Sequence, residues 1–342
     1  MKIKFLIIIF LSIFTIACNA ENKGSKINSK NILVTAGGFE VEKDNDNYTF
    51  NNPENTNWDK TVSITEVLDK YSKNVNSYSI WITRDWQSDW YPIDKINENT
   101  KKGYIPVFIY YTIGDQSSID YIKNNEKDYF ERLNRFKDFL SKIKGDKYVI
   151  FEPEYNQNGT ESWTGMNNLF NKSFEILHSI NNVKVGPCIG DFGNYNLIND
   201  LSAWNLFDNS IKDSIKNADF ISFQEMRALS RNTKIEIFNT PERAKNFSIY
   251  LTKKYNKPTM LAYISISDYE FGEDNQAKVF KDFVKELPEM KSKGNLKMIG
   301  LMHYFDYPNH EGYFYPAYEE RFGVITSNGR KKESFKYFNE FK

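Results

Sequence analysis

The sequence predicts a single (β/α)8 TIM barrel, and three features of the chain support this prediction. Short apolar segments alternate with segments of helical periodicity. The apolar segments rarely alternate with polar residues, which is typical of strands covered by protein on both faces. The unit repeats eight times within residues 31–342, which agrees with a closed barrel in length and in number of strands.

The expected strands are the eight apolar segments 32–36, 78–83, 105–111, 147–152, 183–188, 219–223, 259–264 and 296–304. The expected helices occupy 60–74, 92–101, 126–143, 166–180, 205–216, 241–255, 276–291 and 330–341. A chain that alternates in this way forms a parallel sheet with right-handed crossovers. No internal boundary is visible, so we expect residues 31–342 to form one domain.

An open, doubly wound sheet is the alternative architecture. Such a sheet often binds a dinucleotide at a Gly-x-Gly-x-x-Gly turn after its first strand. The turn at this place, Ala36-Gly37-Gly38-Phe39, lacks that spacing. The chain also has no cysteine cluster and no histidine pair at helical spacing. We therefore favour the barrel and expect neither a cofactor nor a metal.

The first residues indicate export. Lys2 and Lys4 precede an apolar run over 5–14, which is too short for a permanent membrane span. A charged start, a short apolar run and small residues at the cut are typical of a secretory signal peptide, here 1–17. An N-terminal transmembrane anchor is the alternative.

Cys18 follows Thr15-Ile-Ala and resembles the lipidated cysteine of bacterial lipoproteins. We therefore expect a lipid on Cys18 that anchors the chain to a membrane of a bacterial cell envelope, with a flexible tether over 18–30. Cys188 would then have no disulfide partner and is expected in the core.

The composition limits the possible partners. The chain has 45 basic and 45 acidic residues, and this balance gives no electrostatic reason to bind nucleic acid. Aromatic residues make up 16% of the chain, which suits stacking against sugar rings and equally suits an ordinary core. We expect a monomer whose partner is an oligosaccharide or polysaccharide.

The stretch 147–159 contains the most informative polar residues. An apolar strand runs directly into Glu152 and Glu154, and alternation along a strand would point both carboxylates the same way, roughly 7 Å apart. Two carboxylates at the end of a buried strand are costly unless a site uses them. A solvated strand end that leads into a turn is the ordinary interpretation.

Other polar and aromatic residues follow the expected strands at the same rim, where barrels hold their working residues. Glu225, after the sixth strand, is a candidate second carboxylate, although it could instead pair with Arg227 or Arg231. Sugars offer hydroxyls to polar groups and C–H faces to aromatic rings. The candidate substrate-binding residues are Trp81, Arg84, Trp86, Tyr111, Asn156, Trp163, Asp191, Tyr263, His303 and Asp306.

Three segments resemble clan-A glycoside hydrolases. They are FEPEYNQNG at 151–159, KPTMLAY at 257–263 and FGVITSNGRKKESF at 322–335. Family 26 is nearest, with its strand-four motif Arg-Pro-x-His-Glu-x-Asn-Gly. The resemblance implies an endo-acting hydrolase of a mannan-like or β-glucan polysaccharide. It also implies a glutamate acid/base after strand four and a glutamate nucleophile after strand seven.

This chain departs from the family at both catalytic positions. Alignment on Pro153 places Asn156 at the acid/base, and alignment on Lys257-Pro258 places Tyr263 at the nucleophile. One hypothesis keeps an enzyme, with Glu154 as the acid, Glu225 or Asp268 as the second carboxylate, and Glu152 tuning Glu154. The second is a barrel that binds glycans without cleaving them, or a surface lipoprotein whose acidic residues are structural. A deacetylase or lyase is the weakest hypothesis, because no metal or base motif supports it.

Overall fold

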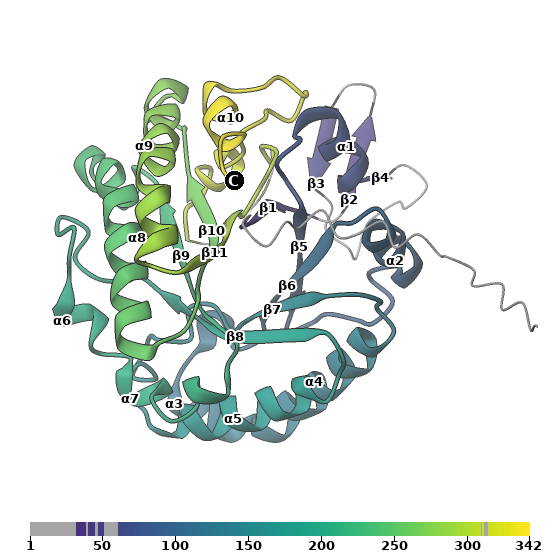
Figure 1. Ribbon diagram of the computed structural model, residues 1–342, viewed down its shortest axis with the longest axis vertical. Helices are drawn as coiled ribbons and strands as arrows, with labels where there is room; N and C mark the ends of the chain where they lie inside the picture. Colours follow the sequence, from purple (N-terminus) through teal and green to yellow (C-terminus); the bar gives the residue numbers. More distant parts are fainter. Residues whose placement is uncertain (1–31, 39, 45–46, 51–60, 309, 311–313) are drawn as a thin grey trace, which may run out of the picture.

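Eight parallel strands form a closed barrel, as the sequence predicts (Figure 1). The computed structural model describes residues 32–342 apart from 39, 45–46, 51–60, 309 and 311–313. The expected signal peptide, Cys18 and tether lie outside these residues. Around the barrel the order is β1-β11-β10-β9-β8-β7-β6-β5. The strands are β1 (Leu33–Gly37), β5 (Ser77–Thr83), β6 (Ile105–Tyr111), β7 (Lys147–Phe151), β8 (Val183–Gly190), β9 (Ile221–Arg227), β10 (Thr259–Ile266) and β11 (Leu296–Leu301).

Helices surround the strands (Figure 1). Each buries an apolar face; on α4 this face includes Leu133, Phe136 and Leu140. The helices are α1 (Ile64–Tyr71), α2 (Ile93–Lys101), α3 (Ile119–Asn124), α4 (Glu126–Ser141), α5 (Gly165–His178), α6 (Leu201–Trp204), α7 (Asp208–Ile211), α8 (Lys234–Tyr255), α9 (Glu273–Ser292) and α10 (Glu333–Phe338).

A small antiparallel sheet follows β1 and was not predicted. It consists of β2 (Glu40–Asp44), β3 (Asn47–Phe50) and β4 (Thr61–Ser63), in the order β3-β2-β4. Its strands are short and polar, so they lack the apolar signal that marks the barrel strands. The first helix consequently begins at 64 and not at 60, with the Ser63 side chain capping it by accepting from the Thr65 N–H.

Two further expected helices differ from those observed. The expected helix 205–216 is replaced by α7 and a 3-10 turn at Ile215–Asn217. Helix α8 begins at Lys234 and not at 241, because Thr233 and Glu236 form a capping box there. Pro241 therefore lies inside α8 and does not start it.

Apolar side chains fill the barrel interior, so the barrel is not a pore. Val107, Ile150 and Met298 belong to this inner cluster, together with Cys188. Phe151, the next residue of β7, instead packs outward against α5, with its ring 5.7 Å from that of Phe170. The open space above the inner cluster lies at the carboxyl ends of the strands.

Candidate active site

A cavity of about 560 Å³ lies at the carboxyl ends of the barrel strands, and we call it the barrel pocket. Residues from β5, β6, β9 and β10, and from the loops after β7, β8, β9 and β11, line it. The lining residues are Trp81, Tyr111, Glu154, Gln157, Asp191, Phe192, Tyr195, Gln224, Met226, Arg227, Arg231, Asn232, Tyr263, Met302, His310, Phe314, Tyr315 and Glu319. This is the region where barrel enzymes hold their active sites.

Three aromatic rings form one apolar part of the pocket. Trp81 contacts Tyr111 edge-to-face, with ring centroids 5.9 Å apart, and contacts Tyr263 at 5.5 Å. All three side chains line the cavity. The arrangement offers flat apolar surface of the kind against which the C–H face of a sugar stacks.

Glu154 is the carboxylate that the loop after β7 contributes to the pocket. Its Oε1 accepts a hydrogen bond of 2.9 Å from Nε2 of Gln224. Burial raises the pKa of Tyr263 well above its usual value, and the nearby Glu154 charge adds to that rise. Burial also raises the pKa of Tyr315 to about 12, where Arg227 acts against the rise and Glu154 adds to it. Glu154 therefore lies near the phenols of both tyrosines.

Glu152 does not line the pocket, so the expectation that it points the same way as Glu154 is corrected. Strand β7 ends at Phe151, and both glutamates adopt positive φ angles, 48° at Glu152 and 63° at Glu154. This backbone breaks the alternation on which the expectation rested.

The Glu152 carboxylate is bound by the loop after β6. It accepts hydrogen bonds from the backbone N–H groups of Thr112 and Ile113, each at 3.0 Å, and from the Thr112 hydroxyl at 2.7 Å. Burial raises the pKa of Glu152 to about 7, although these hydrogen bonds oppose the rise. Its contacts tie β7 to the neighbouring loop.

Asp191 lines the pocket but is held by a buried arginine. Arg243 on α8 donates from Nε and Nη2 to the two carboxylate oxygens, at 2.5 and 2.6 Å. Trp204 donates to the same carboxylate from Nε1 at 3.3 Å. Asp191 is thus held in place as part of the wall.

Glu225 is buried behind the wall and does not line the pocket. Its carboxylate forms an ion pair with Arg227, which does line the pocket and stacks on Tyr195 at 3.8 Å. Burial raises the pKa of Glu225 to about 8; Arg227 lowers it, and the neighbouring Asp191 charge raises it. The alternative that Glu225 pairs with Arg227 is therefore the one observed, and Gln224 and Met226, its neighbours on β9, line the cavity in its place.

Glu319 is a third acid of the pocket and lies in the segment after β11. It accepts from the Tyr315 N–H at 3.0 Å and hydrogen-bonds to Nε2 of His310 at 3.1 Å. Burial acts to raise the pKa of Glu319, but the hydrogen bonds from His310 and Tyr315 outweigh it, so the pKa is lowered. Glu319 is therefore ionised at neutral pH.

Four other candidates lie away from the barrel pocket and have structural contacts. Arg84 donates to the Thr112 and Ile113 carbonyls, and Trp86 packs edge-on against Phe136 and Phe139 in the core. Asn156 exchanges two hydrogen bonds with the backbone of Gly190. Trp163 lines a separate cavity of about 470 Å³ beside α5.

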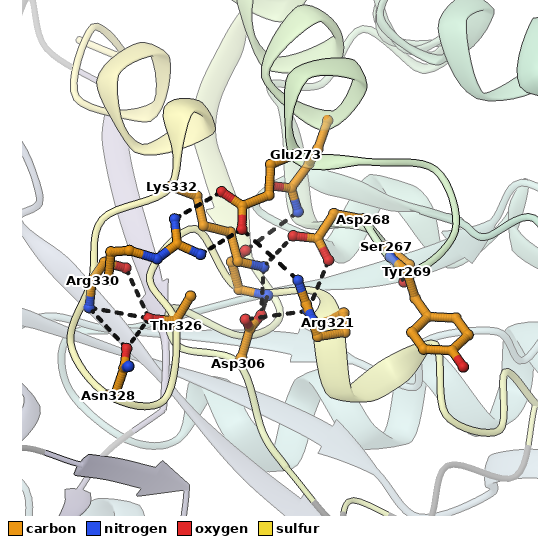
Figure 2. A network of polar contacts seen from close by, with 12 residues as sticks. Ser267, Asp268, Tyr269, Glu273, Asp306, Arg321, Thr326, Asn328, Arg330 and Lys332 are labelled. Atoms are coloured by element: carbon orange, nitrogen blue, oxygen red, sulfur yellow. Dashed lines mark hydrogen bonds and ion pairs between the residues drawn. The ribbon is translucent and has the colours of Figure 1, made fainter.

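His303 and Asp306 also lie outside the pocket lining. The His303 ring contacts Tyr307 and His310, and burial lowers its pKa to about 3, with His310 adding to the effect. Asp306 belongs to the ion-pair network of Figure 2. There Nζ of Lys332, fully buried, lies 2.6 Å from Asp306 and 2.7 Å from Asp268. Asp268, a candidate second carboxylate, therefore pairs with Lys332 and does not line the pocket.

Sequence reasoning missed several lining residues. Arg231 and Asn232 follow β9, while Phe314, Tyr315 and Glu319 lie between β11 and α10. The unusual length of that last segment was a usable signal, because long loops in compact domains are commonly functional. Nothing in the sequence showed which of its residues turn inward.

Among the described residues, no group of three or more side chains is arranged to hold a metal ion. No helix in the described part of the chain is both long and apolar enough to cross a membrane.

Comparisons with known proteins show the fold. No protein-family profile and no curated protein sequence matches the chain. Among solved structures, it is similar to a fungal β-1,4-galactanase (TM-score 0.57, 12% identity, 82% of this chain and 91% of the galactanase covered). An endo-1,4-β-xylanase from Caldicellulosiruptor owensensis gives a TM-score of 0.58 at 14% identity, covering 91% of this chain and 97% of the xylanase. GH5_18 from Bifidobacterium longum gives a TM-score of 0.60 at 13% identity, covering 91% of this chain and 78% of the GH5_18 chain. The chain therefore shares the (β/α)8 barrel fold of these solved structures.

Proposed function

We propose that this chain is a glycoside hydrolase that cleaves a β-linked polysaccharide of the mannan or β-glucan type in the barrel pocket. The observation that carries the proposal is Glu154, which lines an aromatic pocket at the carboxyl end of the barrel, after its fourth strand. The similar solved structures support it, since they include a galactanase and xylanases.

In this proposal Glu154 donates the proton to the leaving glycosidic oxygen. The hydrogen bond from Gln224 fixes one carboxylate oxygen, so the other is oriented by the same contact. Tyr111 and Trp81 hold the sugar ring, and Tyr263 lies beside Glu154. A positioned acid of this kind contributes about 10²–10⁴-fold to the rate.

Glu319 is the second carboxylate of the proposal. Glycoside hydrolysis needs one carboxylic acid and one carboxylate that acts as nucleophile or base. Glu319 is ionised, lines the same pocket and keeps its orientation through two hydrogen bonds. Asp191 suits the role less well, because both of its oxygens bind the guanidinium of Arg243, and this buried ion pair offsets the charge that a nucleophile or base would need.

The test is release of reducing ends from a panel of β-mannans and β-glucans. Glu154→Gln should lower kcat by about 100-fold or more, because the amide cannot donate the proton. Glu131→Gln, an exposed substitution on α4, is the matched control and should leave the rate unchanged. Unchanged activity in Glu154→Gln would remove Glu154 as the acid.

A glycan-binding barrel without hydrolysis is the second candidate function. It is favoured by Tyr263, which lines the pocket where the family resemblance would put a glutamate nucleophile. In that case both the wild type and Glu154→Gln would bind oligosaccharides, and neither would release reducing ends.

The proposal has two further parts, which are the resemblance to glycoside hydrolase family 26 and the place of the protein in the cell. We propose that Cys18 carries a lipid that anchors the chain to a bacterial membrane. Intact-mass spectrometry of the protein from its native membranes tests this, and an unprocessed N-terminus with an unmodified Cys18 would contradict it.

A further inference from the structure

Arg231 is an exposed cation of the barrel pocket that is held in place by Phe314. Its guanidinium stacks on the Phe314 ring at 3.8 Å, and its Nε donates to the Phe314 carbonyl at 2.8 Å. The side chain lines the pocket. These contacts use one face of the guanidinium and one of its N–H groups, and no described residue accepts a hydrogen bond from its two terminal amino groups.

Among the residues that the structure describes, Arg231 has no counterion. In the described part of the chain, no carboxylate lies within ion-pairing distance of it, although the chain supplies such partners elsewhere in this wall. The pairs are Asp191 with Arg243, Arg227 with Glu225, and Glu319 with His310. A cation kept in a partly apolar pocket without an anion is suited to an anionic ligand.

The turn that carries Arg231 is closed by hydrogen bonds and presents a second donor. The Arg231 N–H donates to the Ala228 carbonyl at 3.1 Å, and Oδ1 of Asn232 accepts from the Ala228 N–H at 3.2 Å. Asn232 is only 6% exposed and lines the pocket. Its Nδ2 makes no hydrogen bond to a described residue, which leaves an amide donor beside the guanidinium.

We propose that Arg231 and Asn232 bind the carboxylate of an acidic sugar, so that the substrate is a β-linked polysaccharide containing uronic acid. The planar end of a guanidinium matches the two oxygens of a carboxylate, and the asparagine amide adds a third hydrogen bond. A neutral sugar would leave the guanidinium without an anion. The inference rests on the proposed function, because it assumes that a glycan occupies the barrel pocket.

The test compares sugars that differ only in their carboxylates. Calorimetric titration of Glu154→Gln, used to prevent cleavage, would compare β-1,4-mannotriose with β-1,4-trimannuronate, and cellotriose with its C6-oxidised form. Adding Arg231→Gln should weaken binding of the acidic trimers by about 10-fold or more, because a hydrogen-bonded charge pair is lost. Binding of the neutral trimers should change less than about 2-fold.

Two control variants separate charge from geometry. Arg231→Lys keeps the charge but not the planar pair of donors, and should give an intermediate loss for the acidic trimers. Arg135→Gln removes an exposed arginine from α4, outside the pocket, and should have no effect.

Three results would overturn the inference, and they can be told apart. Neutral trimers that bind at least as well as acidic ones, with no loss in Arg231→Gln, would remove the acidic sugar and leave the proposed function intact. If 6-O-sulfated mannotriose bound as tightly as the acidic trimers and lost as much affinity in Arg231→Gln, the group that Arg231 recognises would be a sulfate and not a carboxylate. Failure of all the trimers to bind would overturn the inference and the proposed function together.

Discussion

At the scale of single residues, the surroundings of Glu152 and Glu154 give two nearby carboxylates different properties. Three donors from the loop after β6 surround Glu152, which is fully buried. Glu154 lines a cavity and accepts from Gln224. Both side chains are glutamates, so their identity does not explain why one lies in the pocket and the other does not. The positive φ angles at both residues explain it.

Glu152 should make folding stability depend on pH. Burial raises its pKa from 4.5 to about 7, so the folded protein binds more protons than the unfolded chain between these values. Its contribution is therefore present below pH 4.5 and is lost as the pH rises through about 7. Relative to Glu152→Gln, which cannot ionise, the wild type should lose stability across this window.

Urea unfolding at several pH values measures this effect as the difference in free energy of unfolding between the two proteins. Glu131→Gln, on the exposed face of α4, serves as the control and should follow the wild type. A difference that stays constant from pH 4.5 to 7 would contradict the raised pKa.

The sequence allowed some of these residues to be placed, but not others. Trp81 and Tyr111 were found because they lie near the ends of clear apolar strands, where a barrel holds its site. Glu152 was misplaced, because positive φ at a non-glycine residue leaves no mark in the sequence. Arg231 was considered only as an ion-pair partner, because its position in the pocket depends on contacts with Phe314, 83 residues away.

At the scale of elements, the network in Figure 2 attaches the C-terminal segment to the barrel. Lys332, just before α10, bridges Asp268 after β10 and Asp306 after β11. Arg321 adds contacts to Asp268 at 2.9 Å and to Asp306 at 3.5 Å. Since Phe314, Tyr315 and Glu319 lie within the segment that these ion pairs hold, the network also positions one wall of the pocket.

Lys332→Met should destabilise the protein by about 3–5 kcal/mol, because it removes the buried cation that the two carboxylates share and leaves them only the partly exposed Arg321. Burial already raises the pKa of Asp306 to about 6, against the opposing effect of Lys332. Denaturant unfolding measures the change. Lys336→Met, an exposed substitution on α10, should cost less than about 1 kcal/mol. Similar losses in the two variants would show that the buried pairs do not hold the segment.

The elements themselves were predictable to different degrees. The eight barrel strands were found because each is a compact apolar segment, and the closed barrel followed from their number. The β2–β4 sheet was missed because its strands are short and polar. The start of α8 was placed too late, because Pro241 was interpreted as a helix start although the capping box precedes it.

At the scale of the whole molecule, the barrel holds its polar and aromatic side chains over an interior that is itself filled with apolar residues. The likeness to solved glycoside hydrolases, at 12–14% identity for the three structures compared, extends to this fold. The claim that a glycan occupies the barrel pocket rests on the chemistry of the residues that line it. Trp163 provides a comparison, because it lines a different cavity on the outside of the barrel.

The most direct test of this claim is the affinity of Glu154→Gln for the trisaccharide that binds best, measured with Trp81→Ala or Trp163→Ala added. Loss of a stacked aromatic ring costs about 1 kcal/mol or more in addition to the lost apolar contact. We predict that Trp81→Ala weakens binding by about 10-fold or more, whereas Trp163→Ala changes it by less than about 2-fold. A loss confined to Trp163→Ala would contradict the account, because it would move the glycan from the barrel pocket to the outer cavity.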